Sequence, residues 1–225
     1  MKKQFQTLFL ACISSLFVLG QVATNDILLH EKDSALRVVF HADSLKIAKE
    51  YDEKARLLNI AVKSEFPLLK GGKYSGVLPV KNVDEIPDPN LSYKILFELT
   101  QNNPESAKKE INAGLDEIAR IINLHIAAGI HLKNMIPVIV VHAGAINAIR
   151  NNEAYKLKYK VDNPNLKLIA DLEKIGAKFI ACGQSLEMFD VKQEELLPEI
   201  KISLSAQTVI TQYQLKGYIL RTLSP

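Results

Sequence analysis

The chain has 225 residues, of which 48% are apolar and 24% are charged, a composition that predicts a globular protein with one well-buried core. Its 28 basic and 25 acidic residues are spread along the sequence and leave a formal net charge of +3. The sequence contains no block of Lys and Arg and no basic stripe interleaved with aromatic residues. We therefore expect no nucleic-acid partner.

Residues 1–23 have the layout of a secretory signal peptide. Lys2–Lys3 supply a short basic region, and residues 4–25 carry no charge. Cleavage after Gly20 and cleavage after Ala23 both fit the pattern. An uncleaved anchor is the alternative, although the apolar run is shorter than the ~20 residues that a membrane span needs. We expect an exported, periplasmic protein that contacts a membrane only if this segment is retained.

The chain has two cysteines, Cys12 and Cys182. Removal of the signal peptide leaves Cys182 alone, so the mature chain cannot form an internal disulfide and carries a free thiol. Lipidation of Cys12 is a third possibility for the N-terminus, but most of the apolar run follows this residue. No Cys/His spacing typical of a zinc site and no dinucleotide or phosphate-binding motif is present, so we expect neither a metal nor a cofactor.

Residues 24–91 are expected to form a helical arm followed by a linker. Apolar residues recur at helical spacing over residues 34–63, which predicts one long amphipathic helix or two shorter ones. A strand at Leu36–Phe40 is the alternative, because Val-Val-Phe favours β-structure. Gly and Pro crowd residues 71–89, as is typical of an irregular linker.

From residue 92 to residue 225 the pattern alternates between strands and helices, which predicts one α/β domain. We expect strands at Tyr93–Leu99, Pro137–His142, Lys178–Cys182 and Tyr218–Arg221, and helices over residues 103–129, 144–158, 164–175, 185–189 and 202–215. Asn103 is the expected cap of the first of these helices, with Pro104 in its first turn. The alternation predicts a mainly parallel sheet with helices on both faces.

Parallel strands end at one edge of their sheet, where ligands and reactive groups gather in open α/β folds. Cys182 ends the third expected strand and is followed by Gly183, Gln184 and Ser185. Gly183 permits a sharp turn, and Ser185 is the expected cap of the next helix. A thiol at the amino end of a helix has a lowered pKa and is a stronger nucleophile. We expect this thiol to be ionised and open to solvent. A buried, inert cysteine is the alternative.

Other polar residues follow the same strand ends. His142 is a candidate base or orienting group for the thiol, or a residue that only caps its strand. Gln184, Asn102 and Asn103 are candidates to hydrogen-bond an anion or persulfide, or are turn and cap residues.

Several segments of the second half resemble the exported branch of the DsrE/DsrF-like family. The resemblance runs from about Tyr93 to the C-terminus, and Ala181–Ser185 is its most specific part. The other segments that carry it are Val140–His142, Asp162–Gly176, Phe179–Ile180, Leu196–Ile200 and Leu204–Ala206.

The resemblance implies a three-layer α/β/α domain with about five strands, and assembly into homotrimers or homohexamers. It also implies a sulfur carrier whose cysteine, matched by Cys182, becomes a persulfide and passes sulfur between a donor and an acceptor protein. The better-studied relatives are cytoplasmic, whereas this chain has an export signal. The expected function is thus a periplasmic sulfur-relay, sulfurtransferase-like protein. The alternative is a non-enzymatic oligomeric module that binds a small ligand or a partner and has an inert cysteine.

Overall fold

The computed structural model describes residues 43–223. The chain divides into two compact units, residues 1–62 and residues 63–225, which are described separately. The expected signal peptide, Cys12, and the alternative strand at residues 36–40 lie outside the described residues. Between residues 43 and 223, no helix is both long enough and apolar enough to cross a membrane.

The described part of the first unit is a single helix, α2 (Asp43–Lys63), which continues into the first residue of the second unit. It matches the second part of the helix expected over residues 34–63. Its 21 residues carry charges on successive turns, and Arg56 pairs with Glu53 one turn earlier at 2.6 Å. Both groups are exposed to solvent, so the pair contributes little to the stability of the helix.

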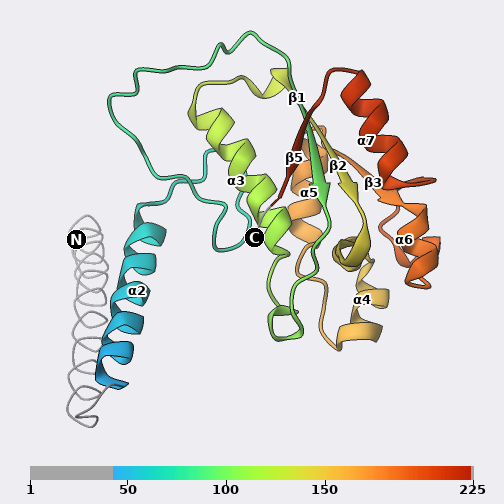
Figure 1. Ribbon diagram of the computed structural model, residues 1–225, viewed down its shortest axis with the longest axis horizontal. Helices are drawn as coiled ribbons and strands as arrows, with labels where there is room; N and C mark the ends of the chain where they lie inside the picture. The colour runs from blue at the N-terminus through green and yellow to red at the C-terminus, as the bar shows by residue number, and fades with distance from the viewer. Residues whose placement is uncertain (1–42, 224–225) are drawn as a thin grey trace, which may run out of the picture. The chain divides into compact units, whose positions relative to one another are not determined.

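The second unit is an α/β domain in which strands and helices alternate (Figure 1). Its strands are β1 (Tyr93–Leu99), β2 (Met135–Val141), β3 (Lys178–Cys182), β4 (Lys201–Ser203) and β5 (Ile219–Thr222). Its α-helices are α3 (Ala113–Ala127), α4 (Asn152–Tyr159), α5 (Leu166–Lys174), α6 (Gly183–Met188) and α7 (Ala206–Leu215). Short 3₁₀ segments occupy Glu105–Ala107, Leu132–Asn134, Ala143–Ile149 and Gln193–Glu195.

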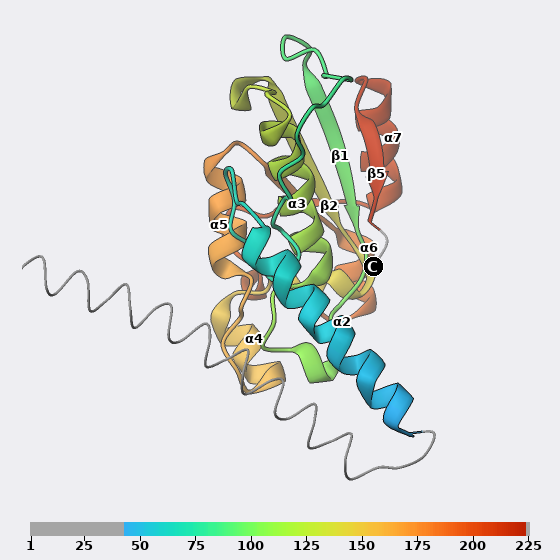
Figure 2. The ribbon, with the colours of Figure 1, turned by 90° about the vertical axis from the view of Figure 1, so that its left-hand side faces the viewer.

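The five strands form one sheet in the order β4-β3-β2-β1-β5, and every neighbouring pair is parallel. Helices α3 and α5 cover one face and α7 covers the other, so the domain has three layers (Figure 2). The expected three-layer α/β/α fold with about five parallel strands is confirmed. Parallel pairing follows from the helical crossovers, because a chain that crosses a sheet face between strands re-enters the sheet in the same direction.

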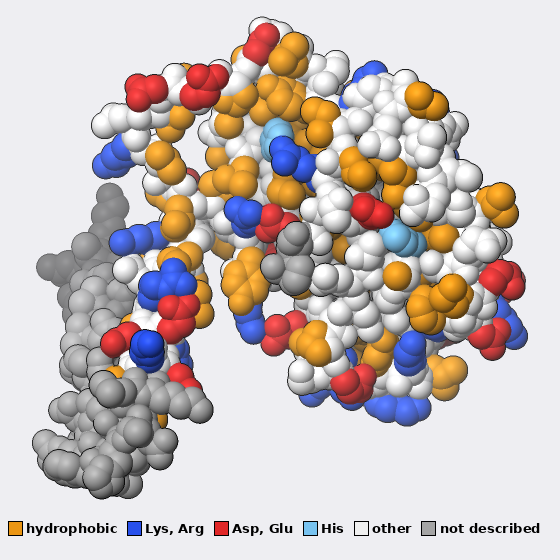
Figure 3. Space-filling model, in the orientation of Figure 1, with side chains coloured by type: hydrophobic (Ala, Val, Ile, Leu, Met, Phe, Trp, Pro, Cys, Tyr) orange, Lys and Arg blue, Asp and Glu red, His pale blue; other side chains and the backbone are white. Residues whose placement is uncertain are grey.

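Alternating side chains divide the core between the two faces of the sheet. Phe97, Ile139 and Ala181 pack with α3 and α5, whereas Leu96 and Val140 pack with α7. Strand β2 is buried on both faces, as its nearly continuous apolar sequence predicts. On the face of the domain seen in Figure 3, acidic and basic side chains are interspersed, in keeping with the small net charge.

The helix expected at residues 103–129 begins nine residues later than predicted, since its cap is residue 112 and not residue 103. Its cap is Asn112, whose Oδ1 accepts hydrogen bonds from the backbone N–H groups of Gly114 and Leu115. Asn103 instead closes the preceding loop, with Nδ2 donating to three backbone carbonyls and Oδ1 accepting from Ala113 N–H. Its assignment as the helix cap is wrong, because the Asn-Pro-Glu signal starts only a short 3₁₀ turn at Glu105–Ala107.

Two other helices are also shorter than expected. Residues 144–158 form a 3₁₀ segment and α4, separated at Arg150, whose φ of −67° and ψ of 145° are extended. Residues 202–215 were expected to be helical throughout, but they begin with β4, and α7 starts only after its cap at Ser205. A three-residue strand is too short to show the alternation that identifies strands in a sequence.

The glycine-rich segment Ser64–Val77, which we call the strap, is irregular as expected but is bound firmly to α3. Backbone bonds between Glu65 and Val77 close its two ends. Asn123 of α3 accepts from Leu68 N–H and Leu69 N–H and donates to the carbonyls of Leu69 and Ser75. Two turns earlier on α3, the carboxylate of Asp116 accepts hydrogen bonds from the backbone N–H groups of Gly72 and Tyr74. The strap is therefore part of the domain, and two buried polar side chains bind its backbone.

Candidate functional site

The carboxyl ends of β1, β2 and β3 bring Glu98, His142 and Cys182 to one edge and one face of the sheet. Val140 of β2 is in register with Glu98 and Ile180. His142 lies two residues beyond Val140 and keeps extended backbone angles, φ −148° and ψ −178°. Because side chains in strands alternate between faces, His142, Glu98 and Cys182 all belong to the face covered by α7.

Cys182 lies at the junction of two helix amino termini. It occupies the N-cap position of α6, and the first residue of α7, Ala206, packs with it in the same cluster. Burial raises the pKa of this thiol. Hydrogen bonds from the Ser185 hydroxyl and from the backbone N–H groups of Ala206, Ser185 and Gln184 outweigh burial and leave the pKa below its ordinary value. These donors favour the thiolate, as the sequence led us to expect.

The thiol is not open to solvent. Cys182 is 5% exposed and belongs to a cluster of buried, mostly aliphatic side chains that also includes Ile180 and Val209. The expectation of an exposed sulfur is therefore wrong, because α7 covers the end of β3 that the sequence suggested would face a crevice. The low pKa must come from hydrogen bonds in a buried setting and not from hydration.

Gly183 and Ser185 have roles different from those expected. Helix α6 starts at Gly183, so Cys182 is its cap and Ser185 is in its first turn. Gly183 is not in the left-handed region, where a sharp turn would need glycine. A Cβ at this position would lie 2.6 Å from the carbonyl oxygen of Ser203, so glycine is needed for the close approach of the loop between β4 and α7.

Ser185 joins the ends of β2 and β3. Its hydroxyl oxygen accepts a 2.9 Å hydrogen bond from Ala143 N–H and its hydroxyl proton is directed to the Cys182 sulfur. Ala143, directly after His142, has a φ of +50°, which is strained for a residue with a side chain and costs on the order of 1 kcal/mol. The Ser185 bond holds this strained turn beside the thiol.

Replacing Ser185 by alanine is expected to raise the pKa of Cys182. The variant loses one of the four donors that favour the thiolate, while burial of the sulfur continues to disfavour it. At pH 7 a smaller fraction of the thiol is then ionised, so alkylation by iodoacetamide should slow and its pH profile should move to higher pH. An unchanged profile would show that the hydroxyl does not act on the sulfur.

The His142 ring is bonded to Glu98, a residue that the sequence analysis did not single out. Nε2 of His142 lies 3.1 Å from Oε1 of Glu98, and Oε2 of Glu98 accepts a 3.4 Å hydrogen bond from the Thr222 hydroxyl of β5. Both ring and carboxylate are mostly buried, with side chains 19% and 17% exposed. Among the described residues, no hydrogen bond joins His142 directly to Cys182. The signal for Glu98 was one acidic residue directly after the apolar run Ile95–Phe97 of the strand Tyr93–Leu99.

The remaining candidates, Gln184, Asn102 and Asn103, differ in whether they contact the thiol. Gln184 is exposed and contributes its backbone N–H, which is shared between the thiol and the carbonyl of Leu204. The side chain of Asn102 donates to the Tyr159 hydroxyl at 3.1 Å, and Asn103 closes its loop as described above. Neither asparagine contacts Cys182 through a hydrogen bond. Within residues 43–223, no cluster of three or more His, Cys, Asp or Glu side chains could hold a metal ion.

Comparison with known proteins assigns the family. A solved structure of a protein of unknown function from Methanobacterium thermoautotrophicum is similar at 18% identity and a TM-score of 0.45, and the match covers 58% of this chain and 99% of that one. No curated protein matches the sequence. The model of the DsrE/DsrF-like family matches residues 94–221, which is more than half of the 225 residues and spans the sheet from β1 to β5 together with Cys182. The chain therefore belongs to the DsrE/DsrF-like family.

Proposed function

We propose that this protein is a periplasmic sulfur carrier that holds sulfur as a persulfide on Cys182. The observation that supports this proposal is the position of the thiol, which receives hydrogen bonds from three backbone N–H groups and one hydroxyl where α6 and α7 begin. A cysteine that served only as an apolar core residue would not require four hydrogen-bond donors around its sulfur. The same donors would stabilise the anionic form of a persulfide.

The proposed reaction is an exchange between sulfur atoms without net oxidation. The Cys182 thiolate attacks the outer sulfur of a donor persulfide, R–S–SH. The sulfur–sulfur bond of the donor breaks, R–S⁻ leaves, and Cys182–S–SH forms. In the second half, the thiolate of an acceptor attacks the outer sulfur of Cys182–S–SH, takes it as its own persulfide, and releases the Cys182 thiolate.

Access to the buried sulfur requires a movement of the loop between β4 and α7. This loop carries Leu204, whose side chain is 74% exposed, and its carbonyl groups lie against the backbone of Gly183 and Gln184. Displacing residues 204–205 together with the start of α7 would uncover the thiol and disturb at most β4, which is a three-residue strand at the sheet edge. We propose that this displacement occurs in the isolated protein, so that small persulfides and thiols can reach the sulfur.

Export and assembly are part of the proposal. The signal-peptide pattern of residues 1–23 supports a periplasmic location for the carrier, where a chain with a single mature cysteine could not inactivate itself by an internal disulfide. Family membership is the basis for proposing homotrimers or homohexamers. Light scattering coupled to size-exclusion chromatography measures this directly.

The test is the loading of purified protein with glutathione persulfide or inorganic polysulfide, followed by trypsin digestion without reductant. Cleavage after Lys178 and Lys192 releases Phe179–Lys192, which contains Cys182 and no other cysteine. We expect this peptide to gain about 32 Da, the mass of one sulfur atom, and to lose it after incubation with a thiol. In a Cys182→Ser variant the peptide should gain nothing. Wild-type protein that never shows the added mass would rule out the carrier function.

One observation favours a second candidate, a non-enzymatic module with an inert cysteine. Cys182 is 5% exposed and packs within an aliphatic cluster, as a structural cysteine would. The two candidates differ in native reactivity. A carrier thiol should react with iodoacetamide at neutral pH in the folded protein, whereas an inert one should react only after unfolding in urea.

A further inference from the structure

The Glu98–His142 pair is a polar arrangement inside a largely apolar face of the sheet. Glu98 follows buried Leu96 on the α7 side of β1, and its carboxylate binds both the His142 ring and the Thr222 hydroxyl. Placing a carboxylate and an imidazole where apolar side chains would pack costs free energy unless each polar atom is paired. The pairing is therefore a specific feature of this edge, and the thiol site lies on the same face.

The Glu98 contact determines which nitrogen of His142 carries hydrogen. An ionised carboxylate only accepts hydrogen bonds, so Nε2, 3.1 Å from Glu98 Oε1, is the donor. In neutral histidine the other nitrogen, Nδ1, then has a free lone pair and is the basic atom. The second carboxylate oxygen is held by Thr222, so the ring is fixed by a chain of contacts that spans β5, β1 and the end of β2.

Cys182 does not need this base for its own ionisation. The four donors around the sulfur already lower its pKa, and no hydrogen bond joins it to His142 among the described residues. The thiol of the sulfur acceptor, in contrast, must lose its proton before it can attack the persulfide, and it needs a base for this step. His142 is partly exposed, follows the strand next to β3, and belongs to the same sheet face as the sulfur.

We infer that His142 exchanges the proton of the incoming or leaving sulfur compound, and that Glu98 is the positioning residue that fixes its tautomer. This inference rests on the proposed sulfur-carrier function. During unloading, Nδ1 takes the proton of the acceptor thiol, and the resulting thiolate attacks the outer sulfur of Cys182–S–SH and releases the Cys182 thiolate. During loading, protonated His142 returns the proton to the leaving thiolate. Each half-reaction balances, since one sulfur–sulfur bond forms as another breaks.

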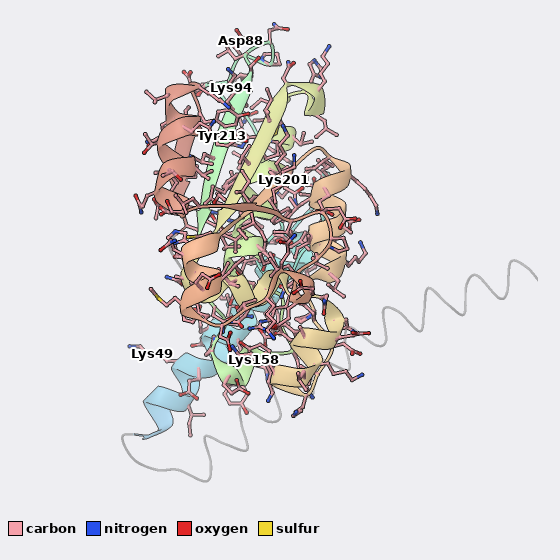
Figure 4. The ribbon with its side chains drawn as sticks, turned by 90° about the vertical axis from the view of Figure 1, so that its right-hand side faces the viewer. Lys49, Asp88, Lys94, Lys158, Lys201 and Tyr213 are labelled. Carbon is pink, nitrogen blue, oxygen red and sulfur yellow. The ribbon has the colours of Figure 1, made fainter. Side chains whose placement is uncertain are left out.

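Few other ionisable groups face this pair. Helix α7, which covers this face, contains no Asp, Glu, Lys, Arg or His. Its one ionisable side chain, Tyr213, lies toward the opposite end of the sheet, near Lys94 at the start of β1 (Figure 4). Glu98, Cys182 and, on the edge strand β4, Lys201 are the ionisable groups that the register places on this face near His142, and a pH profile of sulfur transfer reports on these groups and on the substrate thiol.

The experiment compares wild-type protein with Glu98→Gln, using persulfidated protein and glutathione as the acceptor. Glutamine keeps the shape of glutamate but no longer requires hydrogen on Nε2. We expect transfer at pH 7 to slow roughly ten- to hundredfold. This is less than the rate loss typical of removing a general base, because His142 itself remains in the variant. The defect should shrink above about pH 9, where glutathione ionises in solution, and a merely structural role would not produce this pH dependence. Sulfite dianion, an acceptor with no proton to lose, should react at the wild-type rate.

Two further variants separate the possible outcomes. Glu117→Gln alters a partly buried carboxylate paired with Arg120 on α3 and should leave transfer unchanged. His142→Ala should lose transfer to glutathione and regain part of it in buffer containing imidazole, so the inference stays testable even if Glu98→Gln folds poorly. If wild-type protein never loads sulfur, the carrier function and this inference both fail. If it loads and Glu98→Gln transfers to glutathione as fast as wild type at pH 7, only the role of Glu98 is overturned.

Discussion

Replacing Asn123 by alanine should lower the free energy of unfolding by about 3 kcal/mol. The Asn123 side chain is fully buried and makes four hydrogen bonds, all to the backbone of the strap. Alanine would leave two N–H groups and two carbonyls without partners, and each buried unpaired group costs about 1–3 kcal/mol unless water reaches it. Because the strap lies at the surface, we expect it to detach and admit water, which keeps the loss below the sum of four groups.

Urea unfolding measures the loss, and limited trypsin digestion measures the detachment. Lys70 and Lys73 lie in the strap and should become rapid cleavage sites in Asn123→Ala while wild-type protein resists. Asn90→Ala, at an exposed position near the start of β1, is the matched control and should change the unfolding free energy by less than about 0.5 kcal/mol. A variant as stable and as resistant as wild type would show that the strap contributes little to the domain.

Replacing Gly183 by alanine should both destabilise the domain and raise the pKa of Cys182. The added Cβ would meet the Ser203 carbonyl oxygen at 2.6 Å, and this atom belongs to the backbone and cannot rotate away. The loop between β4 and α7 must shift, with a cost of about 1–3 kcal/mol. The shift moves Ala206, whose N–H is one of the donors to the sulfur, so a hydrogen bond that stabilises the thiolate is weakened.

Urea unfolding and the pH profile of alkylation test this prediction together. We expect the profile of Gly183→Ala to move to higher pH, the direction also expected for Ser185→Ala. Gly144→Ala is the control at the same edge of the sheet, because its Cβ would lie 3.2 Å from the Asn102 Cβ, a milder contact than the 2.6 Å at Gly183. Should Gly183→Ala keep the wild-type profile while losing stability, the loop would have no influence on the thiol.

The sequence predicted those parts of the fold in which local pattern and burial agree. Strands β1 and β3 were predicted with their observed bounds, because short, mostly apolar segments between turn signals identify strands. The start of α3 was misplaced, because Asn103-Pro104-Glu105 and Asn112 both resemble helix starts and only tertiary contacts select between them. Asn112 is selected because its backbone N–H donates to Asn165 and its side chain donates to Gln101.

The same division applies to the candidate site. The sequence identified Cys182 and His142, because the end of a parallel strand places a residue at the common edge whatever its neighbours are. It did not identify Glu98 as the partner of His142, since that contact joins residues 44 positions apart through the register of β1 and β2. Nor did it indicate that α7 covers the sulfur, which depends on how one helix packs across a sheet face.

The sequence by itself determined the alternation of strands and helices apart from β4, the resemblance to the family, and the position of Cys182 at the end of a parallel strand. These features follow from periodicity, turn residues and residue identity, which are local. The tertiary structure alone decided that the thiol is buried, that two helix starts supply its donors, that Glu98 contacts the His142 ring, and that the strap binds α3. Each of these depends on distances between segments far apart in the chain, and no pattern within a single segment contains them.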